Sequence, residues 1–125
     1  MKASPQPGEV WHVDFGYDAK PRYCLVVSVP DPAVRLAIAS VVQLTTQYGG
    51  TPYEVTLPRV PWLREQSYCN AQSVQPVKWV EFVRRAGQFD ARVLVEVRSA
   101  LGLWLGSKRE AASPATTTLE PEQTN

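Results

Sequence analysis

The feature that most constrains the fold is a series of short apolar runs with a period of two, each closed by glycine or proline. "GEVWHVDF" alternates in this way from Glu9 to Phe15, and "RYCLVVSV" does so from Arg22 to Val29, where "PDP" stops it. A period of two is typical of β-strands, because successive side chains point to opposite faces. The chain is therefore expected to fold mainly as antiparallel strands joined by turns.

Further strands follow by the same reasoning. A third is predicted from Leu36 into the threonine pair, with Gln43 and Thr45 on the face opposite Leu44. "QYGGTP" marks a turn, and "YEVTL" is expected to form the fourth strand. After a proline-rich loop, "SYCNAQSV" (67–74) is expected to form the fifth.

A single helix is predicted after these strands. Asp90 is suited to cap its first turn and Gly106 to end it. Between them the apolar residues recur at helical spacing, at Leu94, Val97, Leu101 and Leu105. Several short strands followed by one helix predict a mainly β fold, a small SH3-like antiparallel barrel with a C-terminal α-helix packed on it.

Length and composition indicate one domain. The chain has 125 residues, of which 44% are hydrophobic and 20% charged, enough for a single core. We assign residues 1–106 to this domain. Residues 107–125 are small, polar and interrupted by proline, so we expect a flexible polar tail there.

Charge and motifs exclude several classes of function. Thirteen Lys and Arg face twelve Asp and Glu, so any anion site must be local rather than a property of the whole chain. The first ten residues lack the apolar region of a secretory signal, and no apolar run approaches the roughly 20 residues of a membrane span. A cytoplasmic protein without membrane contact is predicted. Cys24 and Cys69 are isolated and His12 is the only histidine, so we expect two buried reduced thiols, no metal site and no cofactor.

Five segments carry a resemblance to a known family. They are "PGEVWHVDFG", the Arg22 that opens "RYCLVVS", "LTTQYGGTPYEVTL", "SYCNAQSV" and "GQFDARVLVEVRSALGLWLG". In this order, from about Pro7 to Gly106, they resemble the PemK/MazF family of toxin endoribonucleases of type II toxin-antitoxin systems. The resemblance implies an SH3-like barrel, a homodimer, metal-independent cleavage of single-stranded mRNA, and a cognate antitoxin that blocks the toxin.

Arg22 and Thr45 are the residues on which this chemistry is expected to depend. Attack of an RNA 2′-hydroxyl on the adjacent phosphate requires donors for the added charge of the phosphorane. The guanidinium of Arg22 is a planar fork that matches phosphate oxygens, and Thr45 offers a hydroxyl from a strand end. The resemblance implies that these two residues are catalytic. Five further residues are expected to bind the substrate: Lys20, Thr46, Gln47, Asn70 and Gln72.

Two aromatic positions also have predicted roles. His12 lies in mid-strand beside Trp11 and has no counterpart in the family, so we assign it a structural role. Trp62 lies in the proline-rich loop, where an exposed indole could stack on a base.

Departures from the family pattern leave alternatives open. The loop before Arg22 is only "GYDAK", and Ala71 stands where some relatives have an acid. These departures leave open the alternative that the chain is a relative that binds RNA or an antitoxin without cutting RNA. A third alternative is a gyrase-poisoning toxin of the CcdB kind, because "GLWLG" faintly resembles the end of such chains.

Overall fold

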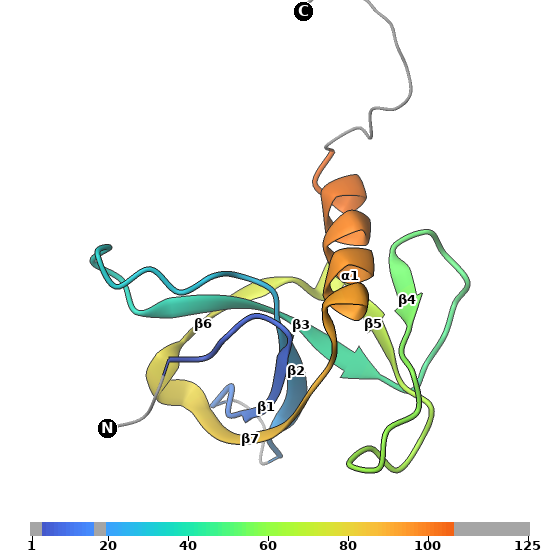
Figure 1. Cartoon of the computed structure of the whole chain (residues 1–125), viewed down its shortest axis with the longest axis horizontal. Coiled ribbons are helices and arrows are strands. Elements are labelled where there is room, and N and C mark those ends of the chain that lie inside the picture. The colour runs from blue at the N-terminus through green and yellow to red at the C-terminus, as the bar shows by residue number, and fades with distance from the viewer. Residues whose placement is uncertain (1–3, 17–19, 107–125) are drawn as a thin grey trace, which may run out of the picture.

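Residues 4–16 and 20–106, which the computed structural model describes, form a curled antiparallel sheet with one long helix packed against it (Figure 1). The elements are, in chain order, β1 (Glu9–Val13), β2 (Arg22–Val26), β3 (Ile38–Thr45), β4 (Glu54–Thr56), β5 (Tyr68–Asn70), the 3₁₀ turn η1 (Ala71–Ser73), β6 (Gln75–Lys78), the 3₁₀ turn η2 (Trp79–Glu81), β7 (Phe82–Gln88) and α1 (Ala91–Trp104). The strands are ordered β4-β5-β3-β2-β1-β7, and β6 pairs with β3. The predicted mainly β fold with a C-terminal helix is confirmed.

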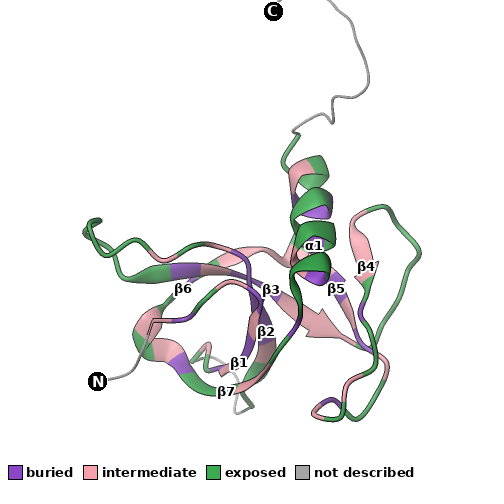
Figure 2. Cartoon of the chain, in the orientation of Figure 1, coloured by how far each residue is buried: buried purple, intermediate pink, exposed green. Residues whose placement is uncertain are grey.

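Two buried clusters lie on opposite faces of β2. Leu25 belongs to the first cluster, which α1 covers with residues such as Val97. Cys24 and Val26 belong to the second, which lies inside the curl of the sheet. Figure 2 shows the buried positions of α1 on the side that faces the strands. Both faces of β2 are therefore covered, so the alternation predicted from Arg22 to Val29 separates two buried faces rather than a buried face from an exposed one.

The fifth strand is shorter than predicted. β5 ends at Asn70, because the Oδ1 atom of Asn70 accepts a hydrogen bond from the N–H of Gln72 (3.0 Å) and so caps η1. β6 and β7 follow directly, although the sequence indicated no element there. Pro76 lies within β6, and β7 pairs with β1 through two register shifts, so neither strand shows a clean period of two.

The helix begins where the sequence predicts. Asp90 caps α1 by accepting a hydrogen bond from the N–H of Val93 (3.2 Å), and Gly106 follows the helix with a φ of 90°. Arg98 ties α1 to the end of β2, because its Nε and Nη2 atoms both donate to the carbonyl oxygen of Val27 (3.0 and 2.8 Å). No helix in the described residues is long and apolar enough to cross a membrane. The predicted tail, residues 107–125, lies outside the described residues.

Candidate functional site

Arg22 and Thr45 are brought together by the register of β2 and β3. Cys24 pairs with Gln43, so continuing this antiparallel ladder by two residues sets Arg22 across from Thr45. Both residues line one pocket of about 440 Å³. Because adjacent strands lie about 5 Å apart, a guanidinium and a hydroxyl on neighbouring strands can reach the same anion.

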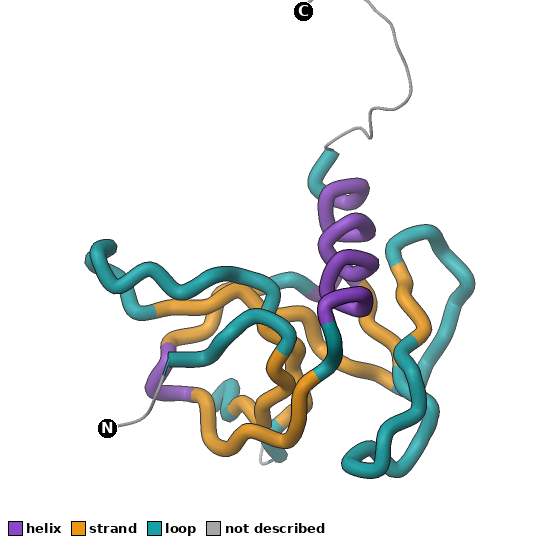
Figure 3. The backbone as a smooth tube through the Cα atoms, in the orientation of Figure 1, coloured by secondary structure: helices purple, strands orange, loops and turns teal. Residues whose placement is uncertain are grey.

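The pocket has walls from two strand ends and one loop. Its other lining residues are Pro21, Tyr23, Gln43, Leu44, Thr46, Leu63, Arg64, Glu65 and Ser67. The last four belong to the β4–β5 loop, which Figure 3 shows below the ends of β3 and β4. Two arginines and one carboxylate line the pocket, so the site is locally cationic in a chain whose net charge is only +1.

One local hydrogen bond orients the hydroxyl of Thr45. Its Oγ1 atom accepts a hydrogen bond from the N–H of Gln47 (3.0 Å), two residues further along the chain. A hydroxyl that already accepts one bond can still donate its hydrogen. This local turn therefore orients Thr45 Oγ1, and its O–H can serve an anion in the pocket.

The β4–β5 loop is closed at its base by hydrogen bonds. The N–H of Leu57 donates to the carbonyl oxygen of Ser67 (3.0 Å), and Gln66 Nε2 donates to the carbonyl oxygens of Leu57 (2.6 Å) and Ser67 (3.1 Å). These bonds fix the two ends of the loop beside each other. Arg64 and Glu65 are thereby presented to the pocket from a closed loop.

Trp62 anchors the same loop to β7. Its indole lies so close to Gly87 that a Cβ atom placed there would come within 2.2 Å of the ring. The ring of Trp62 also packs against Phe89, with 5.1 Å between centroids. Trp62 is half-buried in this arrangement, so the prediction of an exposed, base-stacking indole is wrong. A contact across the sheet, which the loop sequence does not reveal, covers it.

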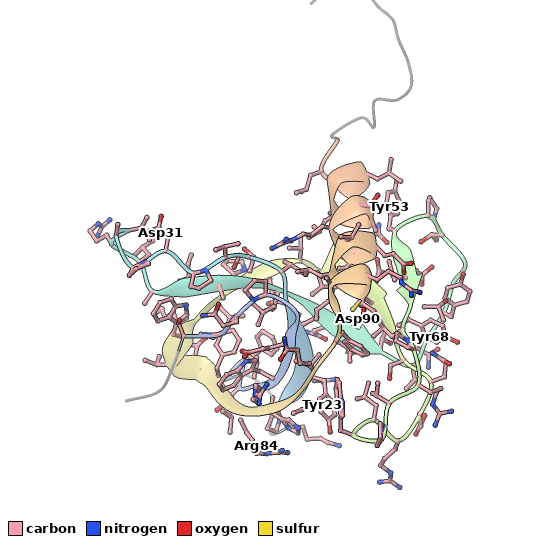
Figure 4. All side chains as sticks on the ribbon, in the orientation of Figure 1. Tyr23, Asp31, Tyr53, Tyr68, Arg84 and Asp90 are labelled. Atoms are coloured by element: carbon pink, nitrogen blue, oxygen red, sulfur yellow. The ribbon has the colours of Figure 1, made fainter. Side chains whose placement is uncertain are left out.

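His12 is paired with an arginine and does not line the pocket. Its Nε2 atom lies 3.0 Å from Arg84 Nη2, and its ring packs edge-on against Tyr23 with 4.3 Å between centroids. Figure 4 shows Tyr23 and Arg84 near each other in the lower part of the view. Because a guanidinium can only donate, Nε2 accepts and the proton of the neutral ring lies on Nδ1. Burial, and then the charge of Arg84, lower the pKa of His12 and favour this neutral form.

The structure places some of the predicted substrate-binding residues at the pocket and others away from it. Thr46 lines the pocket, and Lys20 is exposed one residue before Pro21 at its rim. Gln47 is linked to the site by its N–H on Thr45. Asn70 and Gln72 are outside the pocket lining and instead form the start of η1.

Ala71, the position compared with an acid in some relatives, is also outside the pocket lining. Its side chain is 1% exposed in the first buried cluster, and its N–H donates to the carbonyl oxygen of Tyr53 (2.9 Å). The departure at Ala71 therefore leaves the lining of the pocket unchanged.

Both cysteines are buried thiols, as predicted. Burial raises the pKa of Cys24 to about 12 against the opposing charge of Arg22, and burial raises the pKa of Cys69 far above its usual range. Both thiols are therefore protonated at neutral pH and unreactive. Across residues 4–16 and 20–106, no three His, Cys, Asp or Glu side chains gather to hold a metal ion.

Sequence reasoning missed three pocket residues that have ionisable side chains. Tyr23 follows Arg22 directly, and Arg64 and Glu65 come from the β4–β5 loop. The charged residues at the end of "RVPWLRE" were the available signal for the loop. Which wall of the barrel this loop approaches depends on the contact between Trp62 and Gly87, which no local pattern encodes.

Comparison with known proteins places this geometry in a family. Residues 6–105 match the family model described as PemK-like, MazF-like toxin of type II toxin-antitoxin system. No curated protein matches the chain closely enough to count as a relative.

Solved structures share the fold over almost their full length. An endoribonuclease in complex with its cognate antitoxin, from a mycobacterial species, is 24% identical with a TM-score of 0.71, covering 88% of this chain and 99% of that one. MazE-MazF (form II) from Deinococcus radiodurans is 26% identical with a TM-score of 0.71, covering 86% and 100%. The toxin MazF-mt6 of Mycobacterium tuberculosis is 20% identical with a TM-score of 0.64, covering 78% and 95%.

Proposed function

Because the chain belongs to the family of PemK-like, MazF-like toxins of type II toxin-antitoxin systems, we propose that it is an endoribonuclease that cuts single-stranded mRNA without a metal ion. The observation that carries this proposal is the shared pocket of Arg22 and Thr45, two donors suited to phosphate. The reaction is attack of an RNA 2′-hydroxyl on the adjacent phosphorus. The 2′-oxygen bond to phosphorus forms, the bond to the 5′-oxygen breaks, and a 2′,3′-cyclic phosphate and a 5′-hydroxyl result.

Arg22 and Thr45 have complementary roles in this proposal. The fork of Arg22 binds two phosphate oxygens, and the O–H of Thr45 donates to the charge that develops in the phosphorane. The bond from the N–H of Gln47 supports this role, because it uses an acceptor site of Thr45 Oγ1 and leaves the hydrogen for the substrate.

Glu65 is the group that we assign to the proton of the 2′-hydroxyl. It is the one carboxylate among the described residues that line the pocket, whereas the guanidinium, hydroxyl and amide groups there enter the reaction protonated. A carboxylate within reach of the nucleophile can accept its proton as attack begins. The departing 5′-oxygen takes a proton from water.

The partners are a cognate antitoxin and a second copy of the chain, in the cytoplasm. The antitoxin is supported by the family and by the solved complexes of similar toxins. The homodimer is supported by apolar side chains that α1 leaves exposed, Val95 at 65% and Leu103 at 44%. It is also supported by the position of β4 at the end of the strand order, where one edge has no pairing strand among the described residues.

A cleavage assay tests the proposal directly. A pool of fluorescent single-stranded RNA of random sequence, incubated with the protein in EDTA, is expected to give fragments that end in a 2′,3′-cyclic phosphate. Replacing the 2′-hydroxyl at the preferred site by hydrogen should stop the cut there. Arg22→Ala and Thr45→Ala should each lower single-turnover cleavage by roughly two to three orders of magnitude, the usual cost of one transition-state donor.

Matched variants make this test specific. Arg22→Lys should restore little activity, because a point charge cannot replace a bidentate fork. Val80→Ala, at an exposed position on η2, should cut like the parent. The proposal fails if the parent leaves RNA intact, or if Arg22→Ala cuts as fast as the parent while its thermal unfolding curve is unchanged.

A further inference from the structure

Two stacked tyrosines lie beside the pocket and outside both buried clusters. The rings of Tyr48 and Tyr68 stack with 4.7 Å between centroids and an interplanar angle of 23°. Neither ring is among the residues that pack against the two clusters, and Tyr48 is 55% exposed. Core packing therefore does not explain this pair, and a broad aromatic face remains open to solvent.

The pair is one strand away from Thr45. Tyr68 pairs with Thr45 in the β3–β5 ladder, and Arg22 is level with Thr45 on the other side, across β2 and β3. Residues paired across antiparallel strands project to the same face, about 5 Å apart. Arg22, Thr45 and Tyr68 thus form a row of guanidinium, hydroxyl and aromatic ring. Figure 4 shows Tyr68 near the C-terminal tip of β3, where this row ends.

The loop that carries Tyr48 is fixed before any ligand arrives. The carboxylate of Glu54 accepts hydrogen bonds from the N–H of Gly49 (2.8 Å), the N–H of Thr51 (2.7 Å) and the O–H of Thr51 (2.9 Å). A loop that is already ordered loses little conformational entropy when it binds a ligand. The exposed face of Tyr48 is therefore a preformed surface rather than a mobile side chain on a free loop.

We propose that the exposed face of Tyr48, supported from behind by Tyr68, is the stacking platform for the nucleobase next to the phosphate that Arg22 and Thr45 bind. This inference rests on the proposed function and adds the base to the phosphate site. Flat aromatic rings beside a cationic pocket are suited to single-stranded nucleic acid, because bases stack on the ring while the backbone phosphate meets the cation. Stacking accepts any base, so the platform contributes affinity and position rather than a fixed sequence.

Binding of an uncleavable strand tests the platform apart from catalysis. We would measure fluorescence anisotropy with a labelled single-stranded pool that carries 2′-fluoro groups in place of the attacking hydroxyls. Tyr48→Ala is expected to weaken binding by roughly 5- to 150-fold, the usual cost of losing one stacked base. Tyr48→Phe keeps the ring and should bind like the parent. Val80→Ala removes exposed apolar surface from η2 and should also bind like the parent.

An abasic scan identifies the stacked base. One nucleotide at a time is replaced by an abasic unit in a defined strand that the protein binds. The parent should lose affinity at one position, and Tyr48→Ala should be insensitive to the abasic unit at that position. In the cleavage assay Tyr48→Ala should raise KM and leave single-turnover cleavage at saturation within about threefold, whereas Arg22→Ala lowers the saturated rate.

The outcomes separate this inference from the proposed function. Cleavage by the parent together with equal binding by Tyr48→Ala and the parent overturns the platform and leaves the nuclease standing. Binding that depends on Tyr48, without any cleavage, overturns the nuclease and retains the platform. If the parent protein binds no single-stranded nucleic acid, the platform is overturned.

Discussion

Among the single residues, Glu65 is the one proposed to accept the proton of the 2′-hydroxyl. It is exposed on the β4–β5 loop, and the same pocket presents Arg22 and Thr45. If it accepts the 2′-hydroxyl proton, Glu65→Gln keeps the shape and removes the base, so single-turnover cleavage should fall by about a hundredfold or more. RNA affinity should change little.

A shorter carboxylate distinguishes a base from a structural side chain. Glu65→Asp keeps the carboxylate at a different reach, so it should retain part of the single-turnover cleavage that Glu65→Gln loses. A Glu65→Gln variant that cuts as fast as the parent would assign the proton transfer to another group.

His12 gives a prediction about stability and pH. Burial and the charge of Arg84 lower its pKa in the folded state below the usual value of 6.5. Above that value both folded and unfolded forms are neutral, so His12 contributes no pH dependence. As the pH falls through it, the unfolded chain takes up the proton first, so the free energy of unfolding decreases.

Urea unfolding at about pH 7.5 and about pH 5.5 measures this contribution. His12→Gln cannot take up the proton, so the variant should lose less stability than the parent between the two values. Cleavage by His12→Gln should stay within about tenfold of the parent, because His12 does not line the pocket. An equal pH dependence in both proteins would contradict the lowered pKa.

The sequence alone predicts the positions of some of these site residues but not of others. Alternation along β2 and β3 places Arg22 and Thr45 opposite the face of Leu44, and their positions at strand ends are visible in the sequence. Their meeting in one pocket depends on register, which is set by pairing between strands rather than by either strand alone. Glu65 reaches the pocket on an irregular loop, for which no periodicity exists.

Among the elements, the β4–β5 loop and β7 depend on one close contact. A Cβ atom on Gly87 would come within 2.2 Å of the Trp62 ring, so Gly87→Ala must displace the indole. We expect a loss of roughly 1–3 kcal/mol in the free energy of unfolding, the usual range for overpacking. Cleavage should also fall, because Arg64 and Glu65 move with the loop.

A double-mutant cycle shows whether this contact is the cause. In a Trp62→Ala background the ring is absent, so adding Gly87→Ala should cost little further stability. Urea denaturation of the parent, both single variants and the double variant supplies the four free energies. Additive losses would mean that Gly87 is needed for another reason, such as the conformation of β7 itself.

The sequence predicts an element correctly where the residues of that element encode it. Asp90 and the helical spacing that follows predict α1, and the hydrogen bond that Asp90 Oδ1 accepts from the N–H of Val93 confirms the cap. β6 and β7 form against β3 and β1 even though Pro76 and two register shifts interrupt their pattern. Their pairing partners, rather than their own residues, make them strands.

At the scale of the whole molecule, one group of exposed apolar side chains lies on α1 and just after its end. Val95 and Leu103 are 65% and 44% exposed, and Leu105 is 69% exposed after the end of α1. A groove of about 180 Å³ between α1 and the β4 region is lined by Pro52 and Leu103 among others. Apolar side chains beside an open strand edge are typical of a surface that a partner covers.

The proposed homodimer is tested by placing a charge on this surface. If α1 packs against a second copy, Leu103→Glu buries an unpaired carboxylate in the interface, so the dimer should dissociate while the monomer keeps its fold. Sedimentation equilibrium at tens of micromolar should show a dimer for the parent and a monomer for Leu103→Glu. Val80→Glu places the same charge on η2, where the side chain is 82% exposed, and should leave the dimer intact. A monomeric parent, or a dimeric Leu103→Glu with the parent's dissociation constant, would show that α1 does not form the dimer interface.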